Sequence, residues 1–400
     1  MSFYFNIDVI EWDGPFKGHY VVNGFSEVSI NCVIPDVNVV ISLTSSIDEV
    51  RGAWEELERD GIFSPFQARA WLLPFYEFCA PALGAQPLFL LARGKTTARP
   101  LMLMPLCVRR RCGVRFVEWA DCGVSDYNAP VVAADYGPDK VAYSAIWKRS
   151  CALLRGYAVL RLTKMPQNVG GHTNPMTHVT GLREMSSSAW GLPLPRQFEA
   201  FENKIITKTF AKELAKKLRR LAKRGSVTYE TATSPEQRRA VFCALARQRA
   251  ARFAELGRKD NLSDPLYRRF YEATALSPEA SHLSALRMDG EIIAAMFALR
   301  GAGGHQVIMT TFEGGDWKSS SLGHMLLYHA IRSLIDEGID YFDLTVGDEL
   351  YKREFGAQRR PLFEIMQPLS IPGAAVAAAL QLGLWLRDMA AVRHQTSPVR

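Results

Sequence analysis

Residues that can move protons or hold charged groups lie close together between Asp343 and Lys352. Asp343 and Asp348 are carboxylates that could act as a general base, and Tyr351 could donate a proton from its phenol. Tyr351 and Lys352 follow Asp348 by three and four positions, so the three side chains would share one face of a helical turn. Two simpler interpretations stay open: Asp348 caps a helix, or Lys352 forms only a surface ion pair with it.

A short strand and a preceding helix must position this group. Ile339, Tyr341, Phe342 and Leu344 predict a short buried strand, and Asp348 lies beyond its carboxyl end. Open α/β sheets hold their ligands at that end. Residues 326–335 repeat apolar side chains at helical spacing, and Gly338 predicts the end of that helix.

The start of this helix is rich in serine. Ser319, Ser320 and Ser321 precede Leu322 and Gly323. The first backbone N–H groups of a helix have no partner within it and carry a partial positive charge, so they can hold a phosphate. The alternative is an ordinary serine N-cap.

The composition indicates a globular protein of two domains with an anionic partner. A chain of 400 residues exceeds the size at which one core keeps growing, and 48% hydrophobic and 22% charged residues are ordinary values. The formal net charge is +7 and the pI is about 9.0, which favours a nucleotide, RNA or a membrane surface. Residues 208–224 contribute eight basic side chains against one acid. This amphipathic helix is either a solvated face or a surface for phosphate, carboxylate or membrane.

The order of predicted elements suggests two similar halves. We expect an N-terminal extension over 1–36, a first domain over 37–162 and a second over 194–370. Residues 163–193 are rich in Asn, Gly, Ser, Thr and Pro and contain His172 and His178, so we expect a linker or a lid over an acceptor site. Residues 371–400 contain an apolar helix, which would pack on the domain or across a homodimer, or contact a membrane superficially.

The cysteines and the N-terminus indicate a cytoplasmic protein. Seven cysteines with no C-x-x-C spacing predict reduced thiols, and they give no metal-ligand pattern with histidine. The N-terminus lacks the basic region of a secretory signal, and no stretch of about 18 apolar residues predicts a membrane span. The motifs of nucleophile-elbow hydrolases, zincins, Rossmann dehydrogenases and P-loop NTPases are missing from the sequence.

The segments singled out above resemble the CelD-like acyltransferases, a branch of the GNAT superfamily related to the FemAB peptidyltransferases. The resemblance in the second half rests on the strand 306–312, Ser321-Leu322-Gly323, Phe342-Asp343-Leu344, Gly347-Asp348, Tyr351-Lys352 and Phe355-Gly356. In the first half it rests on Phe66-Gln67 with Trp71, Met104-Pro105-Leu106, and Ser125-Asp126-Tyr127 with Pro130. It extends over residues 47–367.

This resemblance implies an α/β fold of two tandem GNAT-like domains, each with a mixed, mostly antiparallel sheet flanked by helices, the first being degenerate. It implies transfer of an acyl group from acetyl-CoA or a longer acyl-CoA to an amine or hydroxyl, on a sugar or polysaccharide precursor, without a metal. The thioester would lie between strands 306–312 and 341–344, beside Thr310. The backbone N–H groups of residues Ser321, Leu322, Gly323 and His324 would contact the pyrophosphate.

The resemblance also assigns catalytic roles. Asp348 or Asp343 would be the base, Tyr351 would return a proton to the thiolate, and Lys352 would contact substrate or phosphate. The chain departs from the usual GNAT phosphate loop at Ser320, where Arg or Gln is customary, and at Met325, where a small residue is. Two alternatives stay open: a FemAB-like transferase that takes aminoacyl-tRNA through the basic helix, and a non-catalytic GNAT scaffold that binds an anionic ligand.

Overall fold

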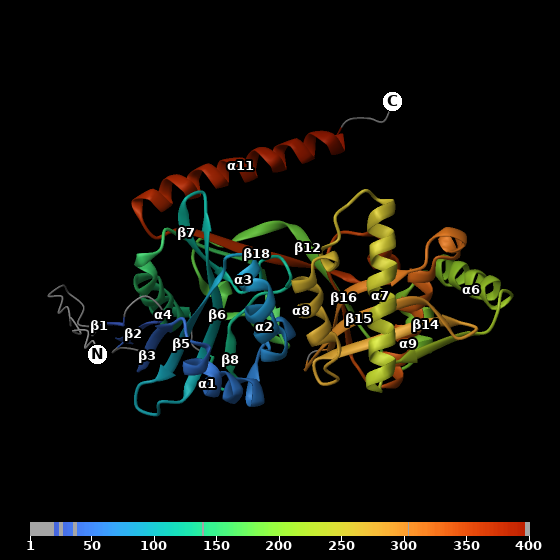
Figure 1. Ribbon diagram of the computed structural model, residues 1–400, viewed down its shortest axis with the longest axis horizontal. Coiled ribbons are helices and arrows are strands. Elements are labelled where there is room, and N and C mark those ends of the chain that lie inside the picture. Colours follow the sequence, from blue (N-terminus) through green and yellow to red (C-terminus); the bar gives the residue numbers. More distant parts are fainter. Residues whose placement is uncertain (1–19, 24–26, 35–37, 138–139, 303, 397–400) are drawn as a thin grey trace, which may run out of the picture. The chain divides into compact units, whose positions relative to one another are not determined.

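The computed structural model describes residues 20–23, 27–34, 38–137, 140–302 and 304–396 (Figure 1). Side chains are described over 38–383, with the same gaps and without 318–319. The chain divides into two compact units, each of which is treated separately. The first unit is Met1–Gln67, Ala80–Ser186 and Leu362–Arg400, and the second unit is Ala68–Cys79 and Ser187–Pro361.

The first unit contains a mixed sheet with helices beside it. Its strands are β1 (Tyr20–Asn23), β2 (Glu27–Ile34), β3 (Val39–Thr44), β4 (Gly61–Ile62), β5 (Gln86–Gly94), β6 (Pro100–Arg111), β7 (Val114–Trp119), β8 (Val131–Ala133), β9 (Val159–Pro166), β10 (Asn168–Val169), β11 (His172–Thr173), the start of β12 (Arg183–Pro193) and the end of β18 (Gln358–Pro368). Its helices are α1 (Ile47–Asp60), η2 (Pro65–Gln67), α3 (Ala80–Ala82), α4 (Lys140–Leu153), η4 (Leu154–Gly156), η5 (Pro175–His178) and α11 (Ile371–Thr396).

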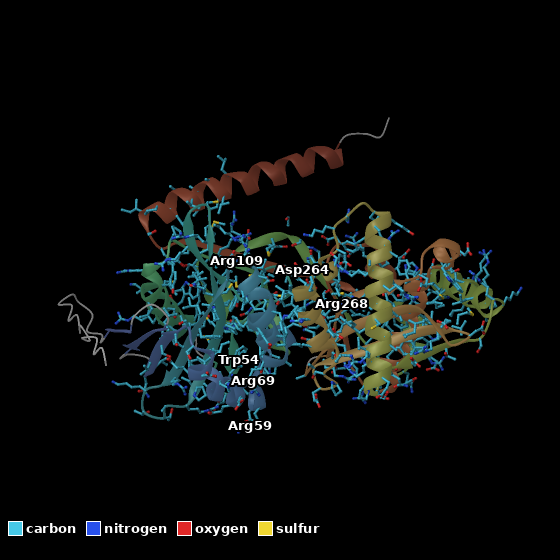
Figure 2. All side chains as sticks on the ribbon, in the orientation of Figure 1. Trp54, Arg59, Arg69, Arg109, Asp264 and Arg268 are labelled. Carbon is cyan, nitrogen blue, oxygen red and sulfur yellow. The ribbon has the colours of Figure 1, made fainter. Side chains whose placement is uncertain are left out.

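The sheet of the first unit runs in the order β1-β2-β3-β5-β6-β7-β9-β18. Its neighbours are antiparallel except for β7 and β9, which are parallel and joined through α4. Helix α1, which carries Trp54 (Figure 2), packs on this sheet. The ring of Trp54 is fully buried, and its centroid lies 5.9 Å from that of Phe89 on β5. The indole N–H of Trp54 also donates to the Gln67 carbonyl at 3.1 Å.

The second unit repeats this order of elements. Its strands are the remainder of β12, β13 (Val227–Thr231), β14 (Ser281–Met288), β15 (Glu291–Gly301), β16 (Gly304–Phe312), β17 (Tyr341–Val346) and the start of β18. Its helices are α2 (Arg69–Pro74), η3 (Phe75–Cys79), α5 (Phe198–Ala200), η6 (Phe201–Ile205), α6 (Lys208–Ala222), α7 (Pro235–Glu255), η7 (Asn261–Ser263), α8 (Pro265–Ala275), η8 (Gly315–Ser320), α9 (Leu322–Asp336) and α10 (Leu350–Glu354).

The sheet of the second unit runs β13-β14-β15-β16-β17-β12. Strands β13 to β16 form an antiparallel meander, and β17 then lies parallel to β16 after the crossover through α9. The buried side chains of α9 recur at helical spacing at Leu322, Leu326, Ala330 and Leu334. They pack in one core with the inner faces of the sheet, with α6 and with Phe201. These features confirm the predicted α/β fold with mixed, mostly antiparallel sheets flanked by helices.

The structure differs from the sequence-based boundaries in three places. Residues 163–193 were expected to be a linker or lid, but they contain the end of β9, the β10–β11 hairpin, η5 and β12. Short turns between paired strands are rich in Gly, Asn and Thr, as linkers are, so composition does not distinguish the two. Segment 68–79 belongs to the second unit, because the ring of Trp71 packs 4.6 Å from that of Phe270 on α8. In the expected extension 1–36, β1 and β2 form an antiparallel hairpin, and the rest of it lies outside the described residues.

The apolar C-terminal helix is α11, and its first half packs on the first unit itself. Ala377 is buried against Phe116 of β7 and Val159 of β9, and Val376 and Leu380 pack around them. This observation favours packing on the domain for that half of the helix. Within the described part of the chain, no helix is long and apolar enough to cross a membrane.

Two histidines are buried together in the second unit. His282 on β14 and His305 on β16 have ring centroids 5.0 Å apart, and no hydrogen-bond partner reaches the ring nitrogens of either among the described residues. Burial lowers the pKa of His282 to about 3; a proton on His305 would act in the same direction, as do the positive charges of Arg300 and Arg238. Burial and Arg300 lower the pKa of His305 to about 4. Both imidazoles are therefore neutral in the folded protein at neutral pH.

We predict that this pair makes the protein sensitive to acid. Both pKa values lie below the ordinary 6.5, so the unfolded state binds more protons below that pH and stability falls as pH decreases. Between pH 7 and 5 the loss is about 2 kcal/mol for each histidine. Urea unfolding of His282→Phe/His305→Phe at both pH values should show about 4 kcal/mol less pH dependence than wild type. The exposed His172→Asn is the control, and an unchanged pH dependence in the double variant would contradict the assignment.

Candidate active site

The central feature of the second unit is an incomplete parallel pair. Strands β16 and β17 are registered at His305 with Phe342 and at Gln306 with Asp343, and at no later residue of these two described strands. Both strands nevertheless continue, β16 to Phe312 and β17 to Val346. The strands therefore separate towards their carboxyl ends, which leaves backbone groups of β16 without a ladder partner on that side. Thr310, predicted as a donor contact, lies on this diverging part of β16.

Bulges in both strands accompany the divergence. Opposite β15, the register shifts so that Ile308 is the extra residue of β16, and opposite β12 the extra residue of β17 is Leu344. Thr345, which follows Leu344, has the left-handed φ of 57°. The hydroxyl of Thr345 donates to the Val307 carbonyl at 2.9 Å, which ties the strands together where they begin to separate. Bulges next to active sites commonly re-aim backbone and side chains.

Asp343 supports this bulge. One carboxylate oxygen accepts the N–H of Thr345 at 2.8 Å, and the other lies 3.5 Å from the guanidinium of Arg360. The side chain is only 1% exposed, so an acceptor substrate has little access to it. Of the two carboxylates predicted as a base, Asp343 is placed to hold the backbone.

Lys352 is buried against the loop that it follows. Its ammonium donates to the carbonyl oxygens of Thr345, Val346 and Gly347 at 3.2, 3.0 and 3.0 Å. The carboxylate of Glu349 lies 3.0 Å away, and the Lys352 side chain is 2% exposed. The sequence predicted a contact with substrate or a surface pair with Asp348, whereas these distances show a cation that gathers the loop carbonyls. An ammonium group has three donors, and the loop occupies them.

Asp348 lies at the surface of this loop and does not cap α10. The N-cap of α10 is Glu349, while one carboxylate oxygen of Asp348 accepts the indole N–H of Trp190 at 3.0 Å. Trp190 is buried on β12, and the guanidinium of Arg353 stands over its ring at 5.0 Å. A buried aromatic donor thus orients a carboxylate on an exposed residue.

Tyr351 lies beside the start of α9. Its ring centroid is 6.2 Å from that of His324, which also packs against Phe355 and Phe210. Burial raises the pKa of Tyr351, with the charge of Glu349 acting in the same direction, so the phenol stays protonated at neutral pH. Such a group can donate a proton to an anion that forms next to it.

The first turn of α9 presents backbone donors. Ser321 is the N-cap, but its side chain makes no capping hydrogen bond and its φ is 52°, so the ordinary serine cap is not formed. The N–H groups of His324 and Met325 donate to the Ser321 carbonyl. The N–H groups of Leu322 and Gly323 have no acceptor within the helix, because the preceding turn belongs to η8. Of the amides predicted to meet a pyrophosphate, Leu322 and Gly323 are therefore the available ones.

Cations of α6 lie beside this turn. Lys217 is near enough that its charge helps burial to lower the pKa of His324, against the opposing charge of Glu354. At the end of the helix, the guanidinium of Arg224 stacks 3.7 Å from the centre of the Trp317 ring. The amphipathic pattern is confirmed, with Leu214 and Leu221 buried. Basic side chains of α6 and of the residues just after it therefore lie near the first turn of α9, where backbone N–H groups are exposed.

Two contributors to the site give no signal in the sequence. Ile308 lies between the apolar residues Val307 and Met309, and a bulge gives no signal in the composition when its extra residue is not glycine. Trp190 lies 158 residues before its partner Asp348 and within a segment predicted as a linker. No group of three or more His, Cys, Asp and Glu residues that could hold a metal occurs in the described chain.

Comparison with known proteins agrees with this geometry. The family described as acetyltransferase (GNAT) domain matches residues 208–353, so this part of the second unit is similar to a GNAT domain. No curated protein matches the sequence.

One solved structure with a similar fold is that of FemX. FemX is 10% identical, with 79% of this chain and 96% of FemX covered and a TM-score of 0.55. The C-terminal domain of a putative lysylphosphatidylglycerol synthetase from Agrobacterium fabrum is 16% identical over 70% of this chain and 84% of that domain, with a TM-score of 0.46. A tandem GNAT protein of the clavulanic acid biosynthesis pathway is 14% identical over 82% and 97%, with a TM-score of 0.44. At such identities the likeness to FemX concerns the fold alone.

We predict that Lys352 is needed for stability. Lys352→Met keeps the volume of the side chain but leaves three carbonyls without their donor, which should lower the free energy of unfolding by about 3 kcal/mol. The matched control, Lys216→Met on the exposed face of α6, should change it by less than about 0.5 kcal/mol. Chemical denaturation measures both. Equal stability of the two variants would show that the ammonium of Lys352 is free for substrate.

Proposed function

We propose that the second unit transfers an acyl group from acyl-CoA to an amine or hydroxyl acceptor. The observation that carries this proposal is the end of the β16–β17 ladder after two registered pairs. The backbone groups of β16 beyond these pairs would line a slot for the donor. Acyl transfer needs hydrogen-bond donors for the oxygen of the tetrahedral intermediate. The bulge at Ile308 would place backbone N–H groups at the edge of this slot.

The phosphate groups of the donor are assigned to the start of α9. The N–H groups of Leu322 and Gly323, the partial positive charge of the helix and the nearby Lys217 and Arg224 form a suitable environment for a pyrophosphate. The absence of the usual Arg or Gln at position 320 is offset here, because Arg224 reaches the hydroxyl of Ser320 at 3.5 Å.

The catalytic step then needs a base and an acid. Asp348 takes the proton from the attacking nitrogen or oxygen as the new bond to the thioester carbon forms. The carbon–sulfur bond breaks, and the phenol of Tyr351 gives its proton to the leaving thiolate. Trp190 holds Asp348, while Asp343 and Lys352 hold the backbone between them.

The acceptor class comes from the CelD-like resemblance. It suggests a sugar or polysaccharide precursor, and acetyl-CoA or a longer acyl-CoA as donor. A cytoplasmic location accords with such donors. A homodimer and a peripheral membrane contact through α11 are compatible with the same assignment.

We predict that Asp348→Asn removes activity without destabilising the protein. The amide oxygen of asparagine still accepts the Trp190 N–H, so the melting temperature should stay within about 1 °C of wild type. Without a base, kcat should fall about a hundred- to ten-thousand-fold, with little change in KM for the donor. Steady-state kinetics with acetyl-CoA and thermal melting give both values.

The matched control is Asp340→Asn, which alters an exposed carboxylate just before β17. It should retain wild-type kcat. Full activity of Asp348→Asn would remove Asp348 as the base.

The basic face of α6 favours one alternative, the FemAB-like transferase that the sequence also suggested, which takes aminoacyl-tRNA as its donor. Under it, the exposed residues Lys216, Arg219 and Arg220 of α6 would meet RNA phosphates, whereas Lys217 faces α9 in either case. Reversal of these three side chains to Glu should then weaken tRNA binding sharply and flatten its salt dependence. For an acyl-CoA enzyme, the same variant should change KM for acetyl-CoA only a few-fold. Filter binding and kinetics on this variant separate the two donors.

A further inference from the structure

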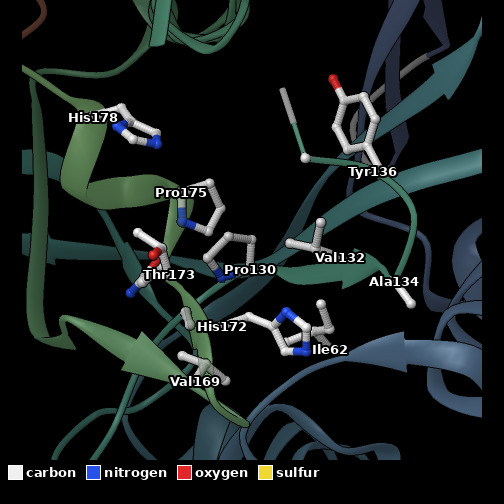
Figure 3. A pocket seen from close by; sticks show the side chains of 13 residues that line it. Ile62, Pro130, Val132, Ala134, Tyr136, Val169, His172, Thr173, Pro175 and His178 are labelled. Carbon is white, nitrogen blue, oxygen red and sulfur yellow. The ribbon is translucent and has the colours of Figure 1, made fainter. Parts of the chain in front are cut away.

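The first unit contains a pocket of about 220 Å³ that the proposed transfer does not use. Its walls come from residues 129–132 around β8, residues 134–137 before α4, and residues 169–178 after β9, with Ile62 beside them (Figure 3). The last of these segments contains His172 and His178, the two histidines of the stretch predicted as a linker or lid.

The pocket lies beside the parallel strand pair of the first unit. Strands β7 and β9 are parallel and joined through α4, as β16 and β17 are through α9. The wall segments follow β7, precede α4 and follow β9, so they lie at the carboxyl edge of this parallel pair. That edge is the usual ligand site of such sheets, and it corresponds to the slot assigned to the donor in the second unit.

The first unit cannot hold a thioester between its parallel strands, because its own chain fills that space. The N–H of Asn128 donates to the carbonyl of Lys164 at 3.0 Å, and the Asn128 amide donates to the carbonyl of Thr163 at 3.2 Å. The ammonium of Lys164 is itself bound, to the Ser125 carbonyl at 2.5 Å and to Asp121 at 3.3 Å. The free volume lies instead in the pocket, beside the segment that contains Asn128.

The wall that carries the histidines is fixed in place. Asn174 is 1% exposed, donates to the Pro166 carbonyl at 2.9 Å and accepts the N–H of Met176 at 3.0 Å. Met176 is fully buried, and the His178 ring packs edge-on to Tyr143 with centroids 6.2 Å apart. A pocket with such walls is preformed, so a ligand would lose little free energy in ordering it.

The chemistry of the lining selects the ligand. The middle of the pocket is apolar, with Pro130, Pro175 and Val132, and in Figure 3 the two proline rings lie between His178 and His172. No Asp, Glu, Lys or Arg is among the described lining residues, so a bound cation would find no countercharge. Burial raises the pKa of Tyr136 to about 12, so its phenol adds no negative charge. Imidazoles can donate to an anion at each end of the pocket.

We propose that this pocket binds a short-chain dicarboxylate, with its methylene groups on the proline rings and its carboxylates at His172 and His178. The volume is below the 300–1,000 Å³ or so of sites for drug-sized ligands, which agrees with a ligand of metabolite size. The site belongs to the first unit alone and does not depend on acyl transfer by the second.

Isothermal titration of the full chain with adipate tests this proposal. Hexanoate, with one carboxylate, and hexanediol, with none, are the matched probes. We expect saturable binding of adipate at one site per chain, at least tenfold weaker binding of hexanoate, and none of hexanediol. Equal binding of hexanediol and adipate would overturn the assignment to an anion, and no binding of adipate would overturn the site.

Variants place the ligand in the pocket. His172→Phe and His178→Phe keep an aromatic ring and should each weaken adipate binding at least tenfold, while His172→Asn, which keeps a donor, should recover part of it. His329→Phe in the second unit, whose ring still can stack on Tyr229, is the control and should bind as wild type does. Thermal melting of each variant confirms folding. Unchanged adipate binding in the folded His172→Phe/His178→Phe protein would show that the ligand lies elsewhere.

Discussion

The second unit depends on a parallel strand pair that is kept from closing. A regular β16–β17 ladder would pair every backbone group along both strands and leave no room for a ligand. Here the ladder stops after Gln306 and Asp343. The next carbonyl of β16, that of Val307, accepts a hydrogen bond from the side-chain hydroxyl of Thr345. Bulges at Ile308 and Leu344 prevent further pairing, because they shift the register on the outer side of each strand.

Holding the strands apart requires support from buried charges. Asp343 accepts the N–H of the left-handed Thr345, and Lys352 gathers the next three carbonyls, so the turn beyond β17 is held from both sides. Neither group is accessible enough to take part in chemistry. Their burial fixes the position of the exposed Asp348, which Trp190 orients from β12. Asp343 and Lys352 thus hold the backbone of the loop that carries Asp348, the carboxylate proposed as the base. Such support is expected where geometry must be held within fractions of an ångström.

Periodic patterns could be predicted well from the sequence. The helical repeat of α9, its end at Gly338 and the strand before Asp348 follow from local spacing, and so does the amphipathic α6. The burial of Lys352 could not be predicted, since a lysine beside an acidic residue usually lies at the surface. The contact of Trp190 with Asp348 joins distant segments, and the strands within 163–193 use residues typical of loops. Such features arise from tertiary pairing, which local composition does not record.

In the proposed reaction the separated strands hold the donor. A crystal structure of the protein with a thioether analogue of acetyl-CoA that keeps the carbonyl group would test this. We expect the pantetheine arm between β16 and β17, the acyl oxygen about 2.7–3.1 Å from a backbone N–H at the Ile308 bulge, and the pyrophosphate on the amides of Leu322 and Gly323. An analogue bound with its acyl oxygen away from β16, or a β16–β17 ladder closed along its full length in the crystal, would contradict this assignment.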